Sequence, residues 1–235
     1  MLTQTTGRSH QIGHPLPSRH NALPSTPRPE IGTDPLAQQI AFMGASMTFA
    51  RNAEIFGENE PADYLYKVVS GAVRTYKILS DGRRQVGGFY LPGDMFGLEF
   101  SDEHTLSAEA VIDTKVLVVK RSTLTALAAR DATVARELYA LTARELRRAQ
   151  ERILLLIKSA QERVASFLLE MTDRSAADNA IELPMSRQDI ADYLGLTIET
   201  VSRTLRSLES AATIEVPTSR RIVLRNRSAL SRLNG

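Results

Sequence analysis

Four polar side chains near the C-terminus fall on one face of a predicted helix. Glu199, Ser202, Arg203 and Arg206 are spaced i, i+3, i+4 and i+7, which places them side by side at 3.6 residues per turn. Arginine pairs with the O6/N7 edge of guanine, glutamate accepts from the cytosine amino group, and serine bonds to either strand. This face therefore predicts the reading of base edges in the DNA major groove. Ile198, just before these residues, belongs to the same predicted contact set.

A helix-turn-helix would position that face. Ser186 and Asp189 fit a capping box at the start of a first helix, and Gly195 breaks the helical pattern. Thr197 can then cap a second helix, because the apolar residues that follow recur on the face opposite the polar one. These residues are Val201, Leu205 and Leu208. The alternative interpretation is a pair of amphipathic helices in an ordinary core, with a charged face that is only solvated.

Two short β-type runs follow the second helix, at residues 214–216 and 221–224, with residues 217–220 between them. The pattern predicts a hairpin, and hence a winged helix. From Thr200 onward, seven arginines stand against two acidic residues, a balance that favours contact with phosphate. We expect Arg220 and Arg221 to contact the DNA backbone.

Residues 199–203 read Glu-Thr-Val-Ser-Arg and resemble the E-x-x-S-R recognition motif of the CRP/FNR family of bacterial transcription regulators. Within that family the chain is most similar to the FixK type, from about residue 40 to the C-terminus. The resemblance implies an α+β fold with an N-terminal antiparallel β-roll of the cyclic-nucleotide-binding kind, a long dimerisation helix and a C-terminal winged helix-turn-helix. The expected parts are a disordered tail (1–36), the β-roll (37–130), the dimerisation helix (131–159) and the DNA-binding domain (160–235).

The composition is that of an ordinary globular protein, with 235 residues, 43% hydrophobic and 24% charged. No apolar run approaches the ~18 to 20 residues that cross a bilayer, so we expect no membrane partner and a cytoplasmic location. The absence of cysteine excludes disulfides and thiolate-held zinc or iron–sulfur clusters. We expect that the chain is not an enzyme, because its sequence contains neither a P-loop nor a nucleophile elbow.

The first 36 residues hold six of the ten prolines and few apolar residues, which favours disorder. His10, His14 and His20 lie in this tail, and we assign them no metal. Beyond it, β-type runs at residues 64–69, 72–78, 85–90 and 116–119, separated by glycine-containing turns, predict an antiparallel roll or sandwich.

Residues 92–97 resemble the entrance of the family's phosphate cassette. The family's glutamate position holds Leu98, and the position of its phosphate-binding arginine lies near His104, with no arginine between Arg84 and Arg121. A buried phosphate without a cation costs several kcal/mol. We therefore expect no bound cyclic nucleotide, and we assign no cofactor or metal.

Residues 131–159 contain neither proline nor glycine, so we expect one continuous helix. Apolar and small residues recur at alternating steps of three and four, the seam of a coiled coil. The predicted dimer interface on this seam consists of Tyr139, Thr142, Leu146, Ala149, Ile153 and Leu156. The seam pattern also includes Ala135 and Ala160. The alternative is a single helix that packs only on its own roll. Residues beside the seam can do that packing and leave the seam free for a second copy, namely Leu138, Leu141, Leu154, Leu155 and Ile157.

The expected function is that of a homodimeric, sequence-specific transcription regulator that binds an inverted repeat of double-stranded DNA. The resemblance suggests an activator that acts with RNA polymerase, half-sites of the TTGA type, and microaerobic, respiratory or nitrogen-fixation genes. We expect DNA binding without an obligatory effector. The alternative hypothesis is a ligand-gated sensor whose roll binds a small molecule.

Overall fold

The computed structural model describes residues 1, 35–99, 101–155, 157–175 and 179–234. All elements named below belong to one compact unit, Ile31–Gly235. The predicted disordered tail lies outside the described residues except for Met1, Pro35 and Leu36. Helix α1 (Pro35–Met43) begins inside the predicted tail, and Leu36 is buried.

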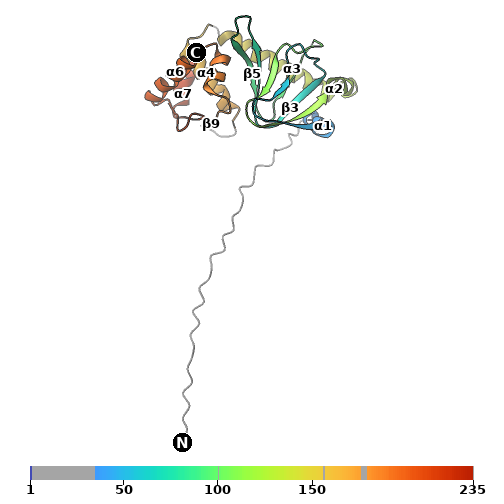
Figure 1. The fold of residues 1–235 in the computed structure, drawn as a ribbon, viewed down its shortest axis with the longest axis horizontal. Coiled ribbons are helices and arrows are strands. Elements are labelled where there is room, and N and C mark those ends of the chain that lie inside the picture. The colour runs from blue at the N-terminus through green and yellow to red at the C-terminus, as the bar shows by residue number, and fades with distance from the viewer. Residues whose placement is uncertain (2–34, 100, 156, 176–178, 235) are drawn as a thin grey trace. The chain divides into compact units, whose positions relative to one another are not determined.

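Two four-stranded antiparallel sheets form the N-terminal roll (Figure 1). One sheet has the order β1-β8-β3-β6, and the other has the order β2-β7-β4-β5. The strands are β1 (Ala45–Phe49), β2 (Glu54–Phe56), β3 (Tyr64–Ser70), β4 (Val73–Ile78), β5 (Arg84–Tyr90), β6 (Met95–Phe96), β7 (Ser107–Ala110) and β8 (Thr114–Lys120). The predicted antiparallel roll is confirmed. Strands β1, β2, β6 and β7 were not predicted, because each is short or carries little β-branched sequence.

Helices α2 (Arg121–Ala128) and α3 (Ala132–Leu155) follow the roll. The prediction of one helix to Ser159 is wrong at its C-terminal end, because α3 stops at Leu155. Ser159 instead caps the next helix, α4 (Ala160–Asp173): its side chain accepts from the Glu162 backbone N–H, and the Glu162 carboxylate accepts from the Ser159 N–H. This reciprocal capping box starts a new helix. Ala160 therefore belongs to α4 and not to the α3 seam.

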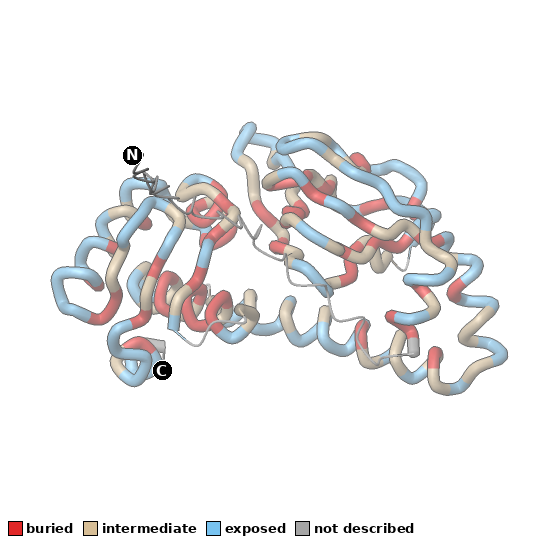
Figure 2. Tube along the Cα trace, turned by 90° about the horizontal axis from the view of Figure 1, so that it is seen from below, coloured by how far each residue is buried: buried red, intermediate tan, exposed pale blue. Residues whose placement is uncertain are grey.

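The middle of α3 is largely exposed (Figure 2). Val134 and Leu141 are its buried residues. Every described residue of the predicted dimer interface is exposed, with Tyr139 76%, Leu146 60% and Ile153 65% accessible; Leu156 lies outside the described residues. Leu154 and Ile157 are also exposed, so the prediction that they pack on the roll is wrong. Leu138, Leu141 and Leu155 do pack within the chain.

The C-terminal region contains α4, strand β9 (Ala180–Glu182), helices α5 (Arg187–Leu194) and α6 (Ile198–Ser210), strands β10 (Ile214–Glu215) and β11 (Arg221–Leu224), and helix α7 (Arg227–Asn234). The strands form an antiparallel sheet in the order β10-β11-β9. One apolar core joins these helices and strands, with Phe167, Ile190, Leu208 and Ile222 at its centre. The predicted winged helix-turn-helix is confirmed.

Candidate nucleic-acid interface

Helix α5 begins at the predicted capping box. The Ser186 hydroxyl accepts from the Asp189 N–H at 3.1 Å, and the Asp189 carboxylate accepts from the Ser186 N–H at 2.9 Å. The helix ends at Gly195, whose backbone is left-handed with φ 63° and ψ 40°. Residues with a Cβ rarely adopt this conformation, so glycine allows the sharp turn into the next helix.

Helix α6 begins where the sequence predicted, because the Thr197 hydroxyl accepts from the Thr200 N–H at 3.2 Å. Its apolar face is the predicted one: Val201, Leu205 and Leu208 are all buried. Packing of this face fixes which side of the helix points outward.

The outward face of α6 carries the predicted base readers. Glu199, Arg203 and Arg206 are exposed, Ser202 is half-buried, and Ile198 is 37% accessible. Among the described residues, no carboxylate lies within ion-pair distance of Arg203 or Arg206, and Glu199 has no cationic partner. Exposed charges without internal partners are available to a ligand from outside the chain.

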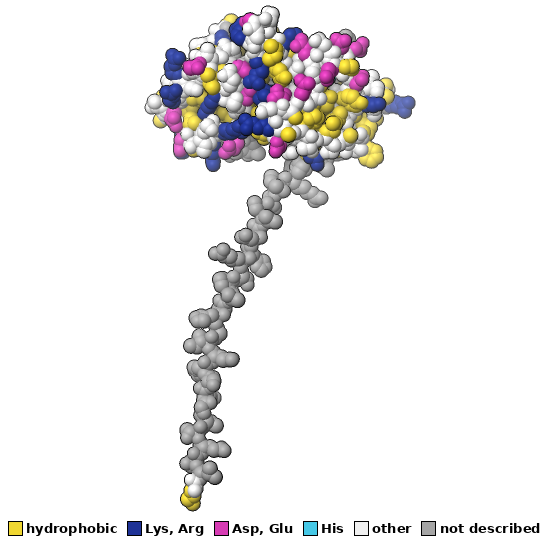
Figure 3. All heavy atoms as spheres, in the orientation of Figure 1, with side chains coloured by type: hydrophobic (Ala, Val, Ile, Leu, Met, Phe, Trp, Pro, Cys, Tyr) yellow, Lys and Arg dark blue, Asp and Glu magenta, His cyan; other side chains and the backbone are white. Residues whose placement is uncertain are grey.

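The wing carries the two other arginines that the sequence predicts as DNA contacts, and both lie beside β9, where the Leu183 N–H donates to the Arg220 carbonyl and Arg221 pairs with Glu182 across the sheet. The Thr218 hydroxyl accepts from the backbone N–H groups of Arg220 and Arg221, at 3.3 and 3.0 Å, which shapes the turn. Arg221 is exposed and Arg220 half-buried. Arg225 is paired with Glu215. Basic side chains lie along the edge of the molecule over α6 and α7 (Figures 1 and 3).

A buried ion-pair cluster that the sequence did not reveal holds α5 against the roll. Arg74 of β4 donates to the Asp189 carboxylate at 3.1 Å, and Arg84 of β5 donates to the same oxygen at 2.6 Å. Arg84 also donates to Asp192 at 2.8 Å. We call these four residues the α5 clasp. It connects the roll directly to the first helix of the helix-turn-helix.

Burial alone raises the pKa of Asp189, but the hydrogen bonds from Ser186 and the charges of Arg74 and Arg84 outweigh burial and hold that pKa below its usual value. Asp189 is therefore a carboxylate that serves two structures at once. It caps α5 and it anchors the helix to the roll. The capping box revealed the first role, whereas the second depends on partners more than a hundred positions away in the sequence.

The interior of the roll is filled by stacked rings. Phe56 stacks on His104 with centroids 3.6 Å apart, and Tyr66 stacks on Phe96 at 5.0 Å. The ring of Tyr90 also contacts Phe96, with centroids 5.3 Å apart. His104 is 2% accessible, and burial lowers its pKa, although Glu99 acts in the opposite direction. The position that resembles the family's phosphate site thus contains a buried imidazole within an aromatic cluster.

Each half of the chain matches a known protein family model. Residues 46–131 match the model of the cyclic nucleotide-binding domain, and residues 162–233 match that of the Crp-like helix-turn-helix domain. The nitrogen fixation regulation protein FixK of Azorhizobium caulinodans is 51% identical over 94% of this chain and 92% of its own length. The chain belongs to the CRP/FNR family. It is a FixK/FNR-type transcription activator with a DNA-binding helix-turn-helix.

Other members of the CRP/FNR family support the same assignment. FixK of Rhizobium meliloti is 41% identical over 79% of this chain and 85% of its own length. The solved structure of FixK2 from Bradyrhizobium japonicum is 55% identical, with a TM-score of 0.80, and covers 82% of this chain and 98% of its own. The family is one of transcription regulators. None of the described helices is long and apolar enough to cross a membrane.

Proposed function

We propose that this chain acts as a homodimer that binds an inverted DNA repeat without an obligatory effector, and that it activates transcription through RNA polymerase. The observation that carries the proposal is the outward face of α6, where Glu199, Arg203 and Arg206 are exposed while the opposite face is buried. A recognition helix reads bases with such side chains in the major groove.

Individual contacts follow from the position of each residue. Arg203 suits a bidentate contact to guanine, and Glu199, one turn earlier, suits a cytosine or adenine amino group. Ser202 and Ile198 suit flanking bases or a thymine methyl group. Arg206 extends the basic face, and Arg220 and Arg221 suit the phosphates beside the groove. A TTGA-type half-site contains a guanine·cytosine pair that Arg203 and Glu199 could read together.

A second copy of the chain fits the seam of α3. Tyr139, Leu146 and Ile153 are large apolar residues, exposed along one stripe with the spacing of a coiled coil. Thr142 and Ala149 lie between them, and we include Leu156 from the sequence pattern alone. Pairing of two such stripes would bury them and would present two recognition helices to the two half-sites.

Independence from a cyclic nucleotide is supported by the content of the roll. The rings of Phe56, Tyr66, Phe96 and His104 occupy its interior. Leu98 replaces the family's acidic residue, and it packs beside a neighbouring apolar cluster. A phosphate placed here would lose its hydration to a hydrophobic neighbourhood.

The experiment that tests this function is binding-site selection from random DNA with the purified, effector-free protein. We expect enrichment of an inverted repeat with TTGA-type half-sites about one helical turn apart. Enrichment of single half-sites would contradict the dimer, and the absence of any enrichment without an added effector would contradict effector independence. The names of the relatives suggest nitrogen-fixation genes as targets, and the family resemblance adds respiratory or microaerobic genes.

The match of residues 46–131 to a cyclic nucleotide-binding domain favours one alternative, a ligand-gated regulator. Cyclic AMP distinguishes the two, because a ligand at 100 times its Kd stabilises the folded state by about 2.7 kcal/mol. We expect no change in melting temperature or in operator affinity. A clear upward shift in melting temperature would favour the gated sensor.

A further inference from the structure

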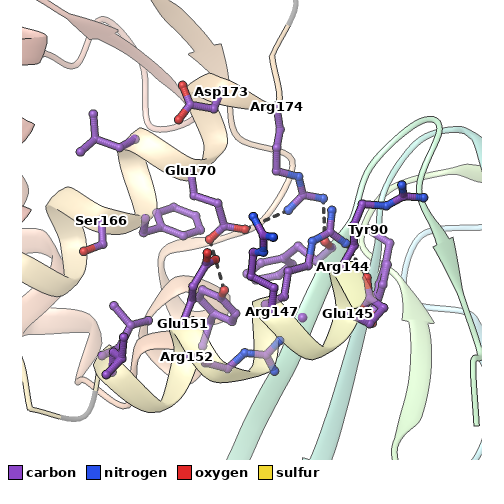
Figure 4. A pocket seen from close by; sticks show the side chains of 18 of the residues that line it. Tyr90, Arg144, Glu145, Arg147, Glu151, Arg152, Ser166, Glu170, Asp173 and Arg174 are labelled. Atoms are coloured by element: carbon purple, nitrogen blue, oxygen red, sulfur yellow. Dashed lines mark hydrogen bonds and ion pairs between the residues drawn. The ribbon is translucent and has the colours of Figure 1, made fainter. Parts of the chain in front are cut away.

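A cavity of about 680 Å³ lies outside the roll's interior, where β5, α3, α4 and α5 meet (Figure 4). Sites for small organic ligands have volumes of about 300–1,000 Å³, so the cavity is large enough for one. It is separate from the recognition face of α6, none of whose residues line it. It is also separate from the aromatic cluster that fills the roll, with which it shares Tyr90 alone.

The floor of the cavity is lined by aromatic rings. Phe89, Phe167 and Tyr193 contact one another there, with ring centroids 5.3 to 6.4 Å apart. Burial raises the pKa of Tyr193 to about 12, so that its hydroxyl stays neutral, and it donates to Glu170 at 3.3 Å. Such a surface favours a flat, apolar or aromatic group.

Five arginines line the mouth and wall of the cavity, and they differ in whether a carboxylate of the chain pairs with them. Arg148 forms ion pairs with Asp94 and Glu145. Arg174 forms ion pairs with Asp94 and Glu170. By contrast, no carboxylate among the described residues lies within ion-pair distance of Arg144, Arg147 or Arg152, the last of which is half-buried. These guanidinium groups are therefore available to an anion.

Arg152 shows this most clearly. Its guanidinium lies over the Tyr193 ring, 5.6 Å from the centroid, and its Nε is buried without a hydrogen-bond acceptor among the described atoms. A buried N–H without an acceptor is costly, so such groups in native structures are normally satisfied by protein, water or ligand. The cavity beside it is where an acceptor would come from.

Glu151 places a negatively charged carboxylate beside the arginines at the same opening (Figure 4). It is exposed, and no cation among the described residues lies within ion-pair distance of it. A ligand that suits the whole cavity thus has an aromatic part that contacts the floor and two or more negative charges that pair with the arginines. It also has hydroxyl or amino groups that donate to Glu151.

We propose that this cavity binds a nucleotide, with its phosphates on Arg144, Arg147 and Arg152 and its aromatic base toward Phe89 and Tyr193. Ribose hydroxyls or the amino group of a base supply the donors for Glu151. The site goes beyond the proposed function, because it concerns a ligand and not DNA, and effector-free operator binding does not depend on it. Its occupant would contact the roll, the α3 helix and the DNA-binding region at once.

Isothermal titration calorimetry of the full-length, DNA-free protein tests the site, with ATP, GTP, adenosine and inorganic pyrophosphate as probes. We expect ATP or GTP to bind at least tenfold more tightly than adenosine or pyrophosphate, because each of these lacks one half of the ligand. The variants Arg152→Gln and Arg144→Gln/Arg147→Gln should each weaken nucleotide binding at least tenfold. The double variant changes two exposed side chains, so it keeps the fold.

A matched control loses the same charge elsewhere. Arg51→Gln/Arg130→Gln removes two other exposed arginines and should bind nucleotide as the wild type does. Three results would overturn the proposal: no binding of ATP or GTP at 1 mM, pyrophosphate binding as tightly as the nucleotides, or equal weakening in the control. Loss of binding in Arg203→Gln/Arg206→Gln but not in the cavity variants would move the nucleotide to the DNA face and would also overturn it.

Discussion

At the junction of the roll and α5, charged side chains are paired inside the chain, whereas on the seam of α3 and on the outward face of α6 several exposed side chains have no partner among the described residues. In the α5 clasp, Arg74 and Asp189 are buried and joined directly. On α6, Arg203 is exposed, with no carboxylate partner among the described residues, and on α3 Ile153 is exposed without a covering group. A buried charge must be paired within the fold, whereas an exposed one can be paired by another molecule. The first region therefore fixes geometry, and the second carries the contacts that we propose for DNA and for a second chain.

The largest expected effect comes from placing charge on the seam. Leu146→Asp/Ile153→Asp would put four unpaired carboxylates into the proposed dimer interface, each at a cost of several kcal/mol. We expect monomers in sedimentation velocity and loss of operator binding. Leu154→Asp is the control, because Leu154 is also exposed but lies off the seam. A double variant that still sediments as a dimer would show that the copies associate through another surface.

Breaking the clasp comes next in size. Asp189→Ala removes one of the two carboxylates paired with the buried Arg74, which keeps Glu109 at 2.6 Å, and the loss of hydrogen bonds to charged groups costs about 1.5–3 kcal/mol. We expect a loss of this order in the free energy of unfolding measured by urea denaturation. Asp81→Ala removes an exposed partner of Arg83 and should leave the stability nearly unchanged. Equal stability of the two variants would mean that the clasp does not hold α5 in solution.

The wing should give a smaller effect that is independent of sequence. Arg221→Ala removes an exposed cation that we place on a phosphate. We expect weaker binding to all sequences alike and a decrease of about one in the slope of log K against log salt. Fluorescence anisotropy at several salt concentrations measures both. A change in base preference would instead place Arg221 in a groove.

The smallest effect concerns pH. The pKa of Asp189 is lowered in the folded state, so its stabilising contribution is present above the unfolded-state pKa, near 3.8, and is lost as the pH falls through the folded-state value. Asp189→Asn lacks this contribution. The difference in unfolding free energy between wild type and variant should thus be constant above about pH 5 and shrink below pH 4. A difference that stays constant down to pH 2 would contradict the role of the carboxylate charge.

The local parts of this structure were predictable because their causes lie close together in the sequence. The caps at Ser186 and Thr197, the buried stripe of α6 and the wing hairpin each depend on residues within a few positions. The end of α3 was missed although the Ser159 capping box is also local, because an uninterrupted run of helix formers outweighed it. The α5 clasp was not predictable, since Arg74 and Asp189 meet only when the roll and α5 pack.

The candidate site shows the same division. The spacing of Glu199, Ser202 and Arg203 predicted a polar face, and the structure exposes Glu199 and Arg203 on the side opposite the buried stripe. The absence of carboxylate partners around Arg203 depends on tertiary packing and required the structure. The arginines of the cavity could not be recognised as a site from the sequence, because the aromatic floor beneath Arg152 comes from three other elements.

The central claim is that Arg203 reads a base, and the most direct test is the affinity of Arg203→Ala for an operator and for each single-base-pair change in its half-site, at two salt concentrations. We expect a loss of about 1–3 kcal/mol per half-site on the operator and relaxed preference at one base pair, with other positions still discriminated. Thermal stability should change by less than about 0.5 kcal/mol, as for an exposed side chain. An Arg203→Ala protein that loses affinity equally on every sequence would contradict the claim, because it would show that Arg203 binds phosphate and not a base.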